Sequence, residues 1–128
     1  MKKKTMLLLF SHNLTEKQKE DAQKLGVGTF VSLPEPLQKI WSHIDPEADS
    51  IVSILDEIKS FVKIHTQKGD MVLIQGDFGA TYHMVAYAKS LGLVALYATT
   101  KRNCNTYMKN DLLYKESTFE HVKFREYI

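Results

Sequence analysis

The stretch Asp70–Thr81, DMVLIQGDFGAT, places a glycine-bracketed turn between an apolar run and a helical pattern. Gly76 and Gly79 allow the backbone to approach a ligand closely, and the amides that open the next helix favour an anion. In an α/β sheet such a turn lies at the carboxyl end of a strand, where ligands usually bind. The segment matches neither GxxxxGK[ST] nor GxGxxG. It therefore predicts a phosphate-type site, at modest specificity.

Polar side chains follow three of the predicted strands at the point where each strand ends. They are Ser11, His12 and Asn13 after the first strand, Gln75, Gly76, Asp77, Phe78, Gly79 and Thr81 after the third, and Thr99, Thr100, Lys101 and Arg102 after the fourth. Parallel strands end at one edge of a sheet, so we expect the three clusters to converge. Hydroxyls and cations bind phosphate, and an aromatic ring can stack on a base. Together they suit a phosphate-bearing nucleotide.

Several of these residues also have a purely structural interpretation. His12 could cap a strand end or pack against the first helix as readily as it could catalyse. Asp77 is more typical of a helix cap, because a carboxylate repels a polyanion unless it binds a hydroxyl or an exocyclic amine. Thr99 and Thr100 suit an ordinary strand, and Lys101 suits a solvated strand end.

The apolar pattern predicts the elements that carry these clusters. With helices between them, strands are expected over Lys4–Ser11, Thr29–Leu33, Met71–Ile74 and Leu93–Ala98. The order β-α-β-α-α-β-α-β is that of a Rossmann-like, mostly parallel sheet flanked by helices. Beyond it, a hairpin around Lys109-Asn110-Asp111 and a final strand through His121–Tyr127 predict antiparallel C-terminal strands.

Composition limits the classes of protein that remain. A length of 128 residues predicts one domain over 1–128, and a net charge of +2 argues against a coat for long nucleic acid. Cys104, as the lone cysteine, cannot form an internal disulfide, which favours a reducing cytoplasm. The apolar run Met6–Phe10 follows N-terminal lysines but is too short for a membrane span and precedes no cleavage site. We interpret it as a strand and expect no membrane association.

Metal and cofactor patterns are missing from the sequence. The histidines show no HExxH spacing, no cysteine cluster occurs and no carboxylate pair stands out. No dinucleotide fingerprint is present either. We expect no metal and no cofactor, so an enzyme built on this site would be metal-independent.

Five sequence blocks carry a resemblance to a known family. They are LLLFSHNLT at Leu7–Thr15, LPEPLQKIW at Leu33–Trp41, QGDFGAT at Gln75–Thr81, YATTKR at Tyr97–Arg102 and HVKFREY at His121–Tyr127. In order and over nearly the whole chain, they resemble a small CRISPR-associated accessory family, the twentieth of the Csx series, linked to type III systems. QGDFGAT together with YATTKR is the most specific pair.

The resemblance implies a ring nuclease with a dimeric, Rossmann-like (CARF-like) fold that needs no metal. Such proteins bind cyclic oligoadenylate, most often cyclic tetra-adenylate, and linearise it, which switches off the antiviral effectors that it activates. The ribose 2′-hydroxyl is the nucleophile, so the products end in a 2′,3′-cyclic phosphate. His12 would then be the general acid or base, Arg102 or Lys101 would stabilise the phosphorane, and Ser11, Thr99 and Thr100 would hold phosphate or ribose.

Three other functions stay open from the sequence. A sensor or sponge would bind cyclic oligoadenylate through the same cleft without cleaving it. A small-molecule α/β enzyme would use a mononucleotide or a phosphorylated metabolite. A general ribonuclease is less natural for a chain of such modest net charge.

Overall fold

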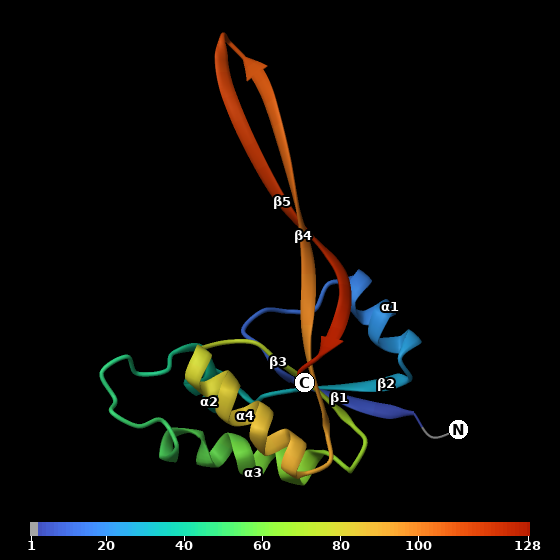
Figure 1. Cartoon of the computed structure of the whole chain (residues 1–128), viewed down its shortest axis with the longest axis vertical. Coiled ribbons are helices and arrows are strands. Elements are labelled where there is room, and N and C mark those ends of the chain that lie inside the picture. The colour runs from blue at the N-terminus through green and yellow to red at the C-terminus, as the bar shows by residue number, and fades with distance from the viewer. Residues whose placement is uncertain (1–2) are drawn as a thin grey trace.

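A five-stranded sheet in the order β2-β1-β3-β4-β5 organises the computed structural model, which describes residues 3–128 (Figure 1). Neighbouring strands pair in parallel from β2 to β4, and β5 pairs antiparallel with β4. The strands are β1 (Lys4–Leu9), β2 (Val27–Ser32), β3 (Met71–Ile74), β4 (Val94–Lys109) and β5 (Leu112–Glu126). The prediction of a mixed α/β fold with a mostly parallel sheet and antiparallel C-terminal strands is confirmed.

Helices flank both faces of the sheet. One face carries α1 (Glu16–Lys24), and the other carries α2 (Glu35–Ser42), the short 3₁₀ turn η1 (Ser53–Leu55), α3 (Asp56–His65) and α4 (Phe78–Ser90). This is the predicted order of elements. Among residues 3–128, no helix is long and apolar enough to cross a membrane.

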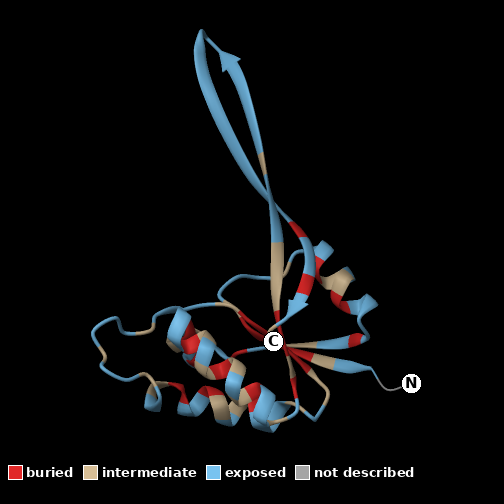
Figure 2. Ribbon diagram, in the orientation of Figure 1, coloured by how far each residue is buried: buried red, intermediate tan, exposed pale blue. Residues whose placement is uncertain are grey.

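The core explains why the parallel strands are apolar without interruption. Leu7 and Leu9 of β1 pack among the helices α2, α3 and α4, whereas Met6 and Leu8 pack on the face covered by α1. Side chains alternate between the faces of a strand, so a sheet covered on both sides needs apolar residues at every position. The buried residues accordingly concentrate where the strands cross between the helices (Figure 2).

The predicted end of the fourth strand at Ala98 is wrong. β4 continues to Lys109 and pairs with β5 along its length, so that the two strands form a ribbon projecting far beyond the sheet (Figure 1). The hairpin and the final strand that we expected separately are parts of this one ribbon. Both faces of the ribbon meet solvent, so its sequence lacks the apolar alternation that identifies a half-buried strand.

A β-bulge lies where the ribbon leaves the sheet. Thr99 pairs with Lys123 but Thr100 pairs with His121, which leaves Val122 as one extra residue on β5. The Thr99 hydroxyl donates to the Lys123 carbonyl at 3.0 Å and accepts from the Lys123 amide at 3.2 Å. A bulge bends and twists a strand pair. This one therefore sets the direction of the ribbon.

The turn at the end of the ribbon offers a test of the hairpin. Asn110 and Asp111 have φ angles of 54° and 63°, the left-handed pair of a type I′ turn. Asp111→Gly should raise the free energy of unfolding by about 0.5 kcal/mol, because glycine adopts a left-handed backbone without the steric penalty that aspartate has. The larger conformational entropy that glycine loses on folding cancels only part of this gain. Urea denaturation would measure this, and a lower stability would contradict the turn assignment.

Candidate functional site

The carboxyl ends of β1 and β3 meet at a polar cavity. These strands lie side by side where the chain order reverses, since β1 has β2 on one side and β3 on the other. Such a reversal opens a crevice at the carboxyl edge of the sheet, where ligands bind. The cavity, of about 490 Å³, is lined by Ser11 just after β1, by Gly76 and Asp77 from the β3–α4 turn, and by Ser42 and His43 at the end of α2. Of the first two predicted clusters, the structure brings Ser11 together with Gly76 and Asp77 at this cavity.

Ser11 is held at this edge by a hydrogen-bond chain from α2. The Gln38 amide donates to the Phe10 carbonyl at 3.0 Å and to the Ser42 hydroxyl at 3.1 Å. The Ser42 hydroxyl donates in turn to the Ser11 hydroxyl at 3.0 Å. Because Ser11 accepts this bond, its own proton stays available for an acceptor such as a phosphate oxygen. Ser42 and His43 were not among the predicted site residues.

Trp41 forms the floor of the cavity. Its side chain is 1% exposed, and its indole N–H donates to the Gln75 carbonyl at 3.1 Å. A Cβ atom at Gly76 would lie 2.9 Å from the indole Nε1 and Cε2 atoms. Glycine is therefore required at position 76 by the close approach of Trp41 in the protein itself.

The start of α4 presents free amides and an exposed ring. Asp77 caps the helix, since its Oδ2 atom accepts from the Ala80 amide at 3.0 Å, as its structural interpretation predicted. The amides of Phe78 and Gly79 have no acceptor within the helix. The Phe78 side chain is 94% exposed and free to stack on a ligand. An anion bound here would accept hydrogen bonds from these amides, and the nearby carboxylate of Asp77 would repel it.

Two further predicted ligand-binding side chains make hydrogen bonds within the fold. The Gln75 Oε1 atom accepts from the Ala98 amide at 2.7 Å, which continues the pairing of β3 with β4 after β3 has ended. The Thr99 hydroxyl is engaged at the bulge. Thr81, on α4, has a buried hydroxyl with no hydrogen-bond partner among the described residues.

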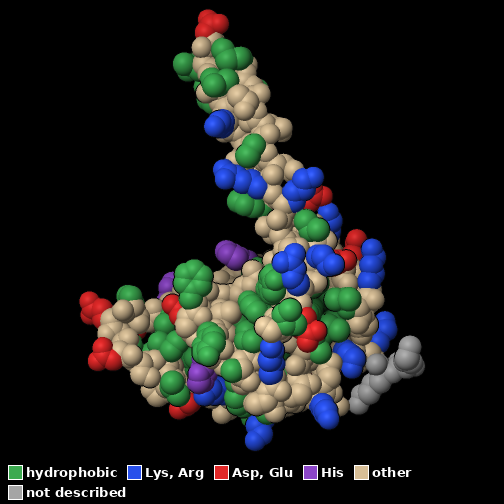
Figure 3. Space-filling model, viewed as in Figure 1, with side chains coloured by type: hydrophobic (Ala, Val, Ile, Leu, Met, Phe, Trp, Pro, Cys, Tyr) green, Lys and Arg blue, Asp and Glu red, His purple; other side chains and the backbone are tan. Residues whose placement is uncertain are grey.

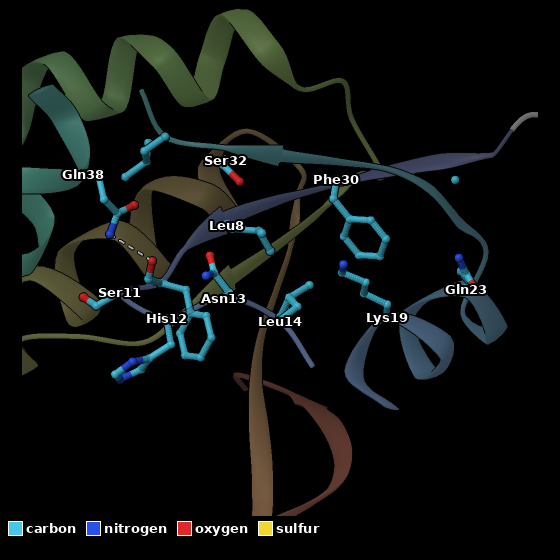
Figure 4. Close-up of a pocket in the computed structure, with 13 residues that line it drawn as sticks. Leu8, Ser11, His12, Asn13, Leu14, Lys19, Gln23, Phe30, Ser32 and Gln38 are labelled. Carbon is cyan, nitrogen blue, oxygen red and sulfur yellow. Dashed lines mark hydrogen bonds between the residues drawn. The ribbon is translucent and has the colours of Figure 1, made fainter. Parts of the chain in front are cut away.

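A second cavity, of about 800 Å³, lies on the other side of Ser11 (Figure 4). Phe10, Leu14 and Phe30 provide apolar walls, and the side chains of Asn13 and Lys19 add polar groups. The edge of the His12 ring approaches Phe10 with centroids 5.4 Å apart. Figure 4 shows this exposed ring turned outward from the cavity. The cavity therefore combines surfaces suited to a nucleobase with donors suited to phosphate or ribose.

The third predicted cluster lies outside both cavities. Thr100, Lys101 and Arg102 lie on the ribbon, where they pair with β5 residues. The Arg102 guanidinium donates to the Ser117 hydroxyl through Nη2 at 3.1 Å and through Nε at 3.4 Å. The expectation that all three clusters meet at strand ends is therefore wrong for this one, because β4 does not end there.

The base of the ribbon is fixed to α1 by a histidine–aspartate contact and an ion pair. Buried His121 has its Nε2 atom 2.9 Å from Asp21 Oδ2, and Lys17 lies 2.7 Å from Glu120. Hydrogen bonds from Lys17 and Asn103 lower the pKa of Glu120. Local sequence patterns do not predict the His121–Asp21 and Lys17–Glu120 pairings, because each joins positions about a hundred apart. Among residues 3–128, no group of three or more His, Cys, Asp and Glu side chains could hold a metal ion.

Tyr127 closes the carboxyl end of β3 from the opposite direction. Its hydroxyl donates to the Ile74 carbonyl at 2.7 Å, and burial, followed by the effect of Tyr97, raises its pKa. Tyr127→Phe should lower the free energy of unfolding by about 1 kcal/mol at neutral pH. Because the pKa of Tyr127 is higher in the folded state, its neutral hydroxyl stabilises the protein at pH values below the unfolded tyrosine pKa of about 10. This stabilisation is lost as the pH rises through the pKa of the folded state. The difference in free energy of unfolding between wild type and variant should therefore shrink above about pH 10. Urea titrations at several pH values would test this.

The comparisons with known proteins place the whole architecture in one family. The uncharacterized protein MJ1673 family matches residues 4–125, from the first strand to the end of the ribbon. The chain belongs to the MJ1673 family. Uncharacterized protein MJ1673 of Methanocaldococcus jannaschii is 46% identical over 123 residues, which cover 95% of each chain. The MJ1673 family match thus includes both cavities and the ribbon. No solved structure matches the chain.

Proposed function

We propose that this protein is a metal-independent ring nuclease that binds and linearises cyclic oligoadenylate, with cyclic tetra-adenylate as its substrate. The observation that carries the proposal is the pair of cavities on either side of Ser11 at the β1–β3 edge. Their lining includes the Ser11 hydroxyl, His12, His43 and aromatic rings, and the free amides at the start of α4 directly follow Asp77 of the smaller cavity. The sequence resemblance described above supports the same chemistry.

The proposed reaction uses the substrate's own nucleophile. The ribose 2′-oxygen forms a bond to phosphorus while the bond from phosphorus to the 5′-oxygen breaks, and the 2′-proton leaves to a base as the 5′-oxygen gains one. Holding these atoms in line contributes several kcal/mol by orientation alone. His12, exposed beside Ser11, is the group that takes or gives a proton. The products are linear adenylates ending in a 2′,3′-cyclic phosphate.

The surroundings assign further roles to the site. The Ser11 hydroxyl and the amides of Phe78 and Gly79 would bind phosphate oxygens, and would stabilise the charge that develops on them. Asn13 and Phe30 would hold an adenine in the larger cavity. A cyclic tetranucleotide exceeds either cavity, so the ring would extend towards the ribbon base, where Arg102 and Lys101 add positive charge.

The setting of this activity follows from the same proposal. The protein would be a cytoplasmic homodimer with a Rossmann-like fold of the CARF type, acting in type III CRISPR signalling. A cyclic tetranucleotide has two-fold symmetry, which a two-fold dimer matches. The strand order, with its reversal between β1 and β3, supports the Rossmann-like assignment.

The deciding experiment incubates the purified protein with cyclic tetra-adenylate in EDTA and follows the products by chromatography and mass spectrometry. Linear adenylates with cyclic-phosphate ends are expected. Intact ligand that co-elutes with the protein would replace the nuclease with a sensor or sponge. Neither cleavage nor binding, with rings of other sizes included, would overturn the proposal. Linear oligoadenylate serves as the control for general ribonuclease activity.

A further inference from the structure

The smaller cavity contains a carboxylate that the fold uses only in part. One oxygen of Asp77, Oδ2, caps α4 by accepting from the Ala80 amide at 3.0 Å. The other oxygen, Oδ1, makes no hydrogen bond with any of residues 3–128, and Asp77 lines the cavity and is exposed. A carboxylate can only accept hydrogen bonds, so Oδ1 is available to a donor that a ligand brings.

Charge indicates which part of a ligand the smaller cavity can hold. None of the described residues that line it is a lysine or an arginine, and Asp77 gives it a negative charge. The loop that follows α2 adds the carboxylates of Asp45, Glu47 and Asp49. Figure 3 shows acidic side chains on this loop at the left, whereas most lysine and arginine side chains in view lie on the ribbon and to the right. A neutral group that donates hydrogen bonds therefore suits the interior of this cavity better than a phosphate does.

The surroundings of the cavity suit a flat aromatic group. Trp41 and Pro46 contribute apolar surface to the lining, and a volume of about 490 Å³ is typical of a small-ligand pocket. Directly after Asp77, the Phe78 side chain is 94% exposed, and that of Tyr82 is 81% exposed. These two rings are one turn apart on α4 and lie on the same side of the helix. A nucleobase matches this combination, because it stacks on aromatic rings and has hydrogen-bond donors at its edge.

We propose that the smaller cavity binds an adenine of the cyclic oligoadenylate, with the exocyclic amino group of the base donating to Asp77 Oδ1. Ser11 lines both cavities, so a phosphate held by its hydroxyl has one base on each side, the second of them in the larger cavity. The inference rests on the proposed function and deepens it, since it assigns base specificity to Asp77. Hypoxanthine has a carbonyl oxygen where adenine has its amino group, so the Asp77 carboxylate would repel it.

The binding of two rings that differ only at this group tests the inference. Cyclic tetra-deoxyadenylate and cyclic tetra-deoxyinosinate lack the 2′-hydroxyl and cannot be cleaved by its attack, so calorimetry measures their binding alone. The wild type should bind the adenine ring about 10- to 100-fold more tightly, the usual worth of a hydrogen bond to a charged group. Equal affinities for the two rings, or no binding of either, would overturn the inference.

Asp77→Asn separates base recognition from the capping of α4, because asparagine caps a helix about as well as aspartate. Its carbonyl oxygen must accept from the Ala80 amide, which leaves its amino group, a donor, facing the ligand. The variant should therefore bind the inosine ring more tightly than the adenine ring. Asp77→Ser, which also caps, should bind both about equally. A residue that served only as a cap would leave the wild-type preference in both variants, and that result would overturn the inference.

Two further measurements complete the test. Asp49→Asn removes the same charge from the neighbouring loop, at a position that does not line the cavity, and should keep the wild-type preference. Trp41 is the one tryptophan of the chain and lines this cavity, so its fluorescence should change when the adenine ring binds. Binding by calorimetry without that change would overturn the inference. Cleavage of the ribose-containing ring decides the nuclease separately, so the failure of either proposal is distinguishable.

Discussion

His12→Ala should slow the cleavage of cyclic tetra-adenylate by about 10²- to 10⁴-fold, the usual contribution of a positioned general acid or base. Its ring is exposed at the edge of the larger cavity and contacts Phe10. Removal should therefore leave folding unchanged and binding within a few-fold. Single-turnover kinetics, with binding measured separately, would distinguish these effects.

The matched control for this variant is His65→Ala. His65 is also exposed, and it stacks on an aromatic neighbour, Phe61, at a centroid distance of 4.0 Å. It lies at the end of α3 and lines neither cavity at the β1–β3 edge. Its loss should leave cleavage at the wild-type rate. Full activity of His12→Ala would remove His12 from the mechanism, even if the protein cleaves the ring.

Trp41→Ala should lower the free energy of unfolding by about 3–5 kcal/mol, the cost of emptying a fully buried aromatic site. The indole packs in the main core and also donates to the Gln75 carbonyl. Trp41→Phe retains most of the ring and should cost clearly less. Guanidinium denaturation of the two variants would measure both values, and a loss below 1 kcal/mol in Trp41→Ala would contradict the packing described here.

A double-mutant cycle with Gly76→Ala isolates the contact beneath the cavity. In the wild type the new methyl group meets the indole at 2.9 Å and should be strongly destabilising. In the Trp41→Ala background the space is vacant, so the same substitution should cost much less. Residues in contact commonly show interaction energies of roughly 0.5–3 kcal/mol in such cycles. Additive costs would mean that glycine is required for another reason.

The parallel part of the fold could be predicted because burial on both faces leaves a clear record in the sequence. Met71–Ile74 is uniformly apolar and was predicted with its observed limits. The convergence of Ser11 with Gly76 follows from the same fact, since neighbouring parallel strands end at one edge. A parallel sheet covered on both faces thus explains both the apolar pattern of the strands and the position of the site.

The rest depends on contacts that no local pattern records. Ser42 and His43 reach the cavity only because Trp41 anchors α2 beneath the β3 turn. Arg102 was assigned to a strand end because polar residues follow Ala98, yet a ribbon exposed on both faces tolerates polar residues throughout. The strand length is maintained by pairing with β5, a partner that follows later in the sequence.

The single extra residue, Val122, determines to which face of the ribbon each side chain of the outer β5 strand points. In an uninterrupted strand, His121 and Phe124 would point to opposite faces. With the bulge between them, both face α1, where their rings lie 4.9 Å apart. If Val122 instead took a regular place opposite Thr100, every residue of the outer β5 strand would shift by one position along β4 and would turn to the other face. The number of residues at the bulge thus decides which side chains of the projecting ribbon lie on each face, whatever the composition of the ribbon.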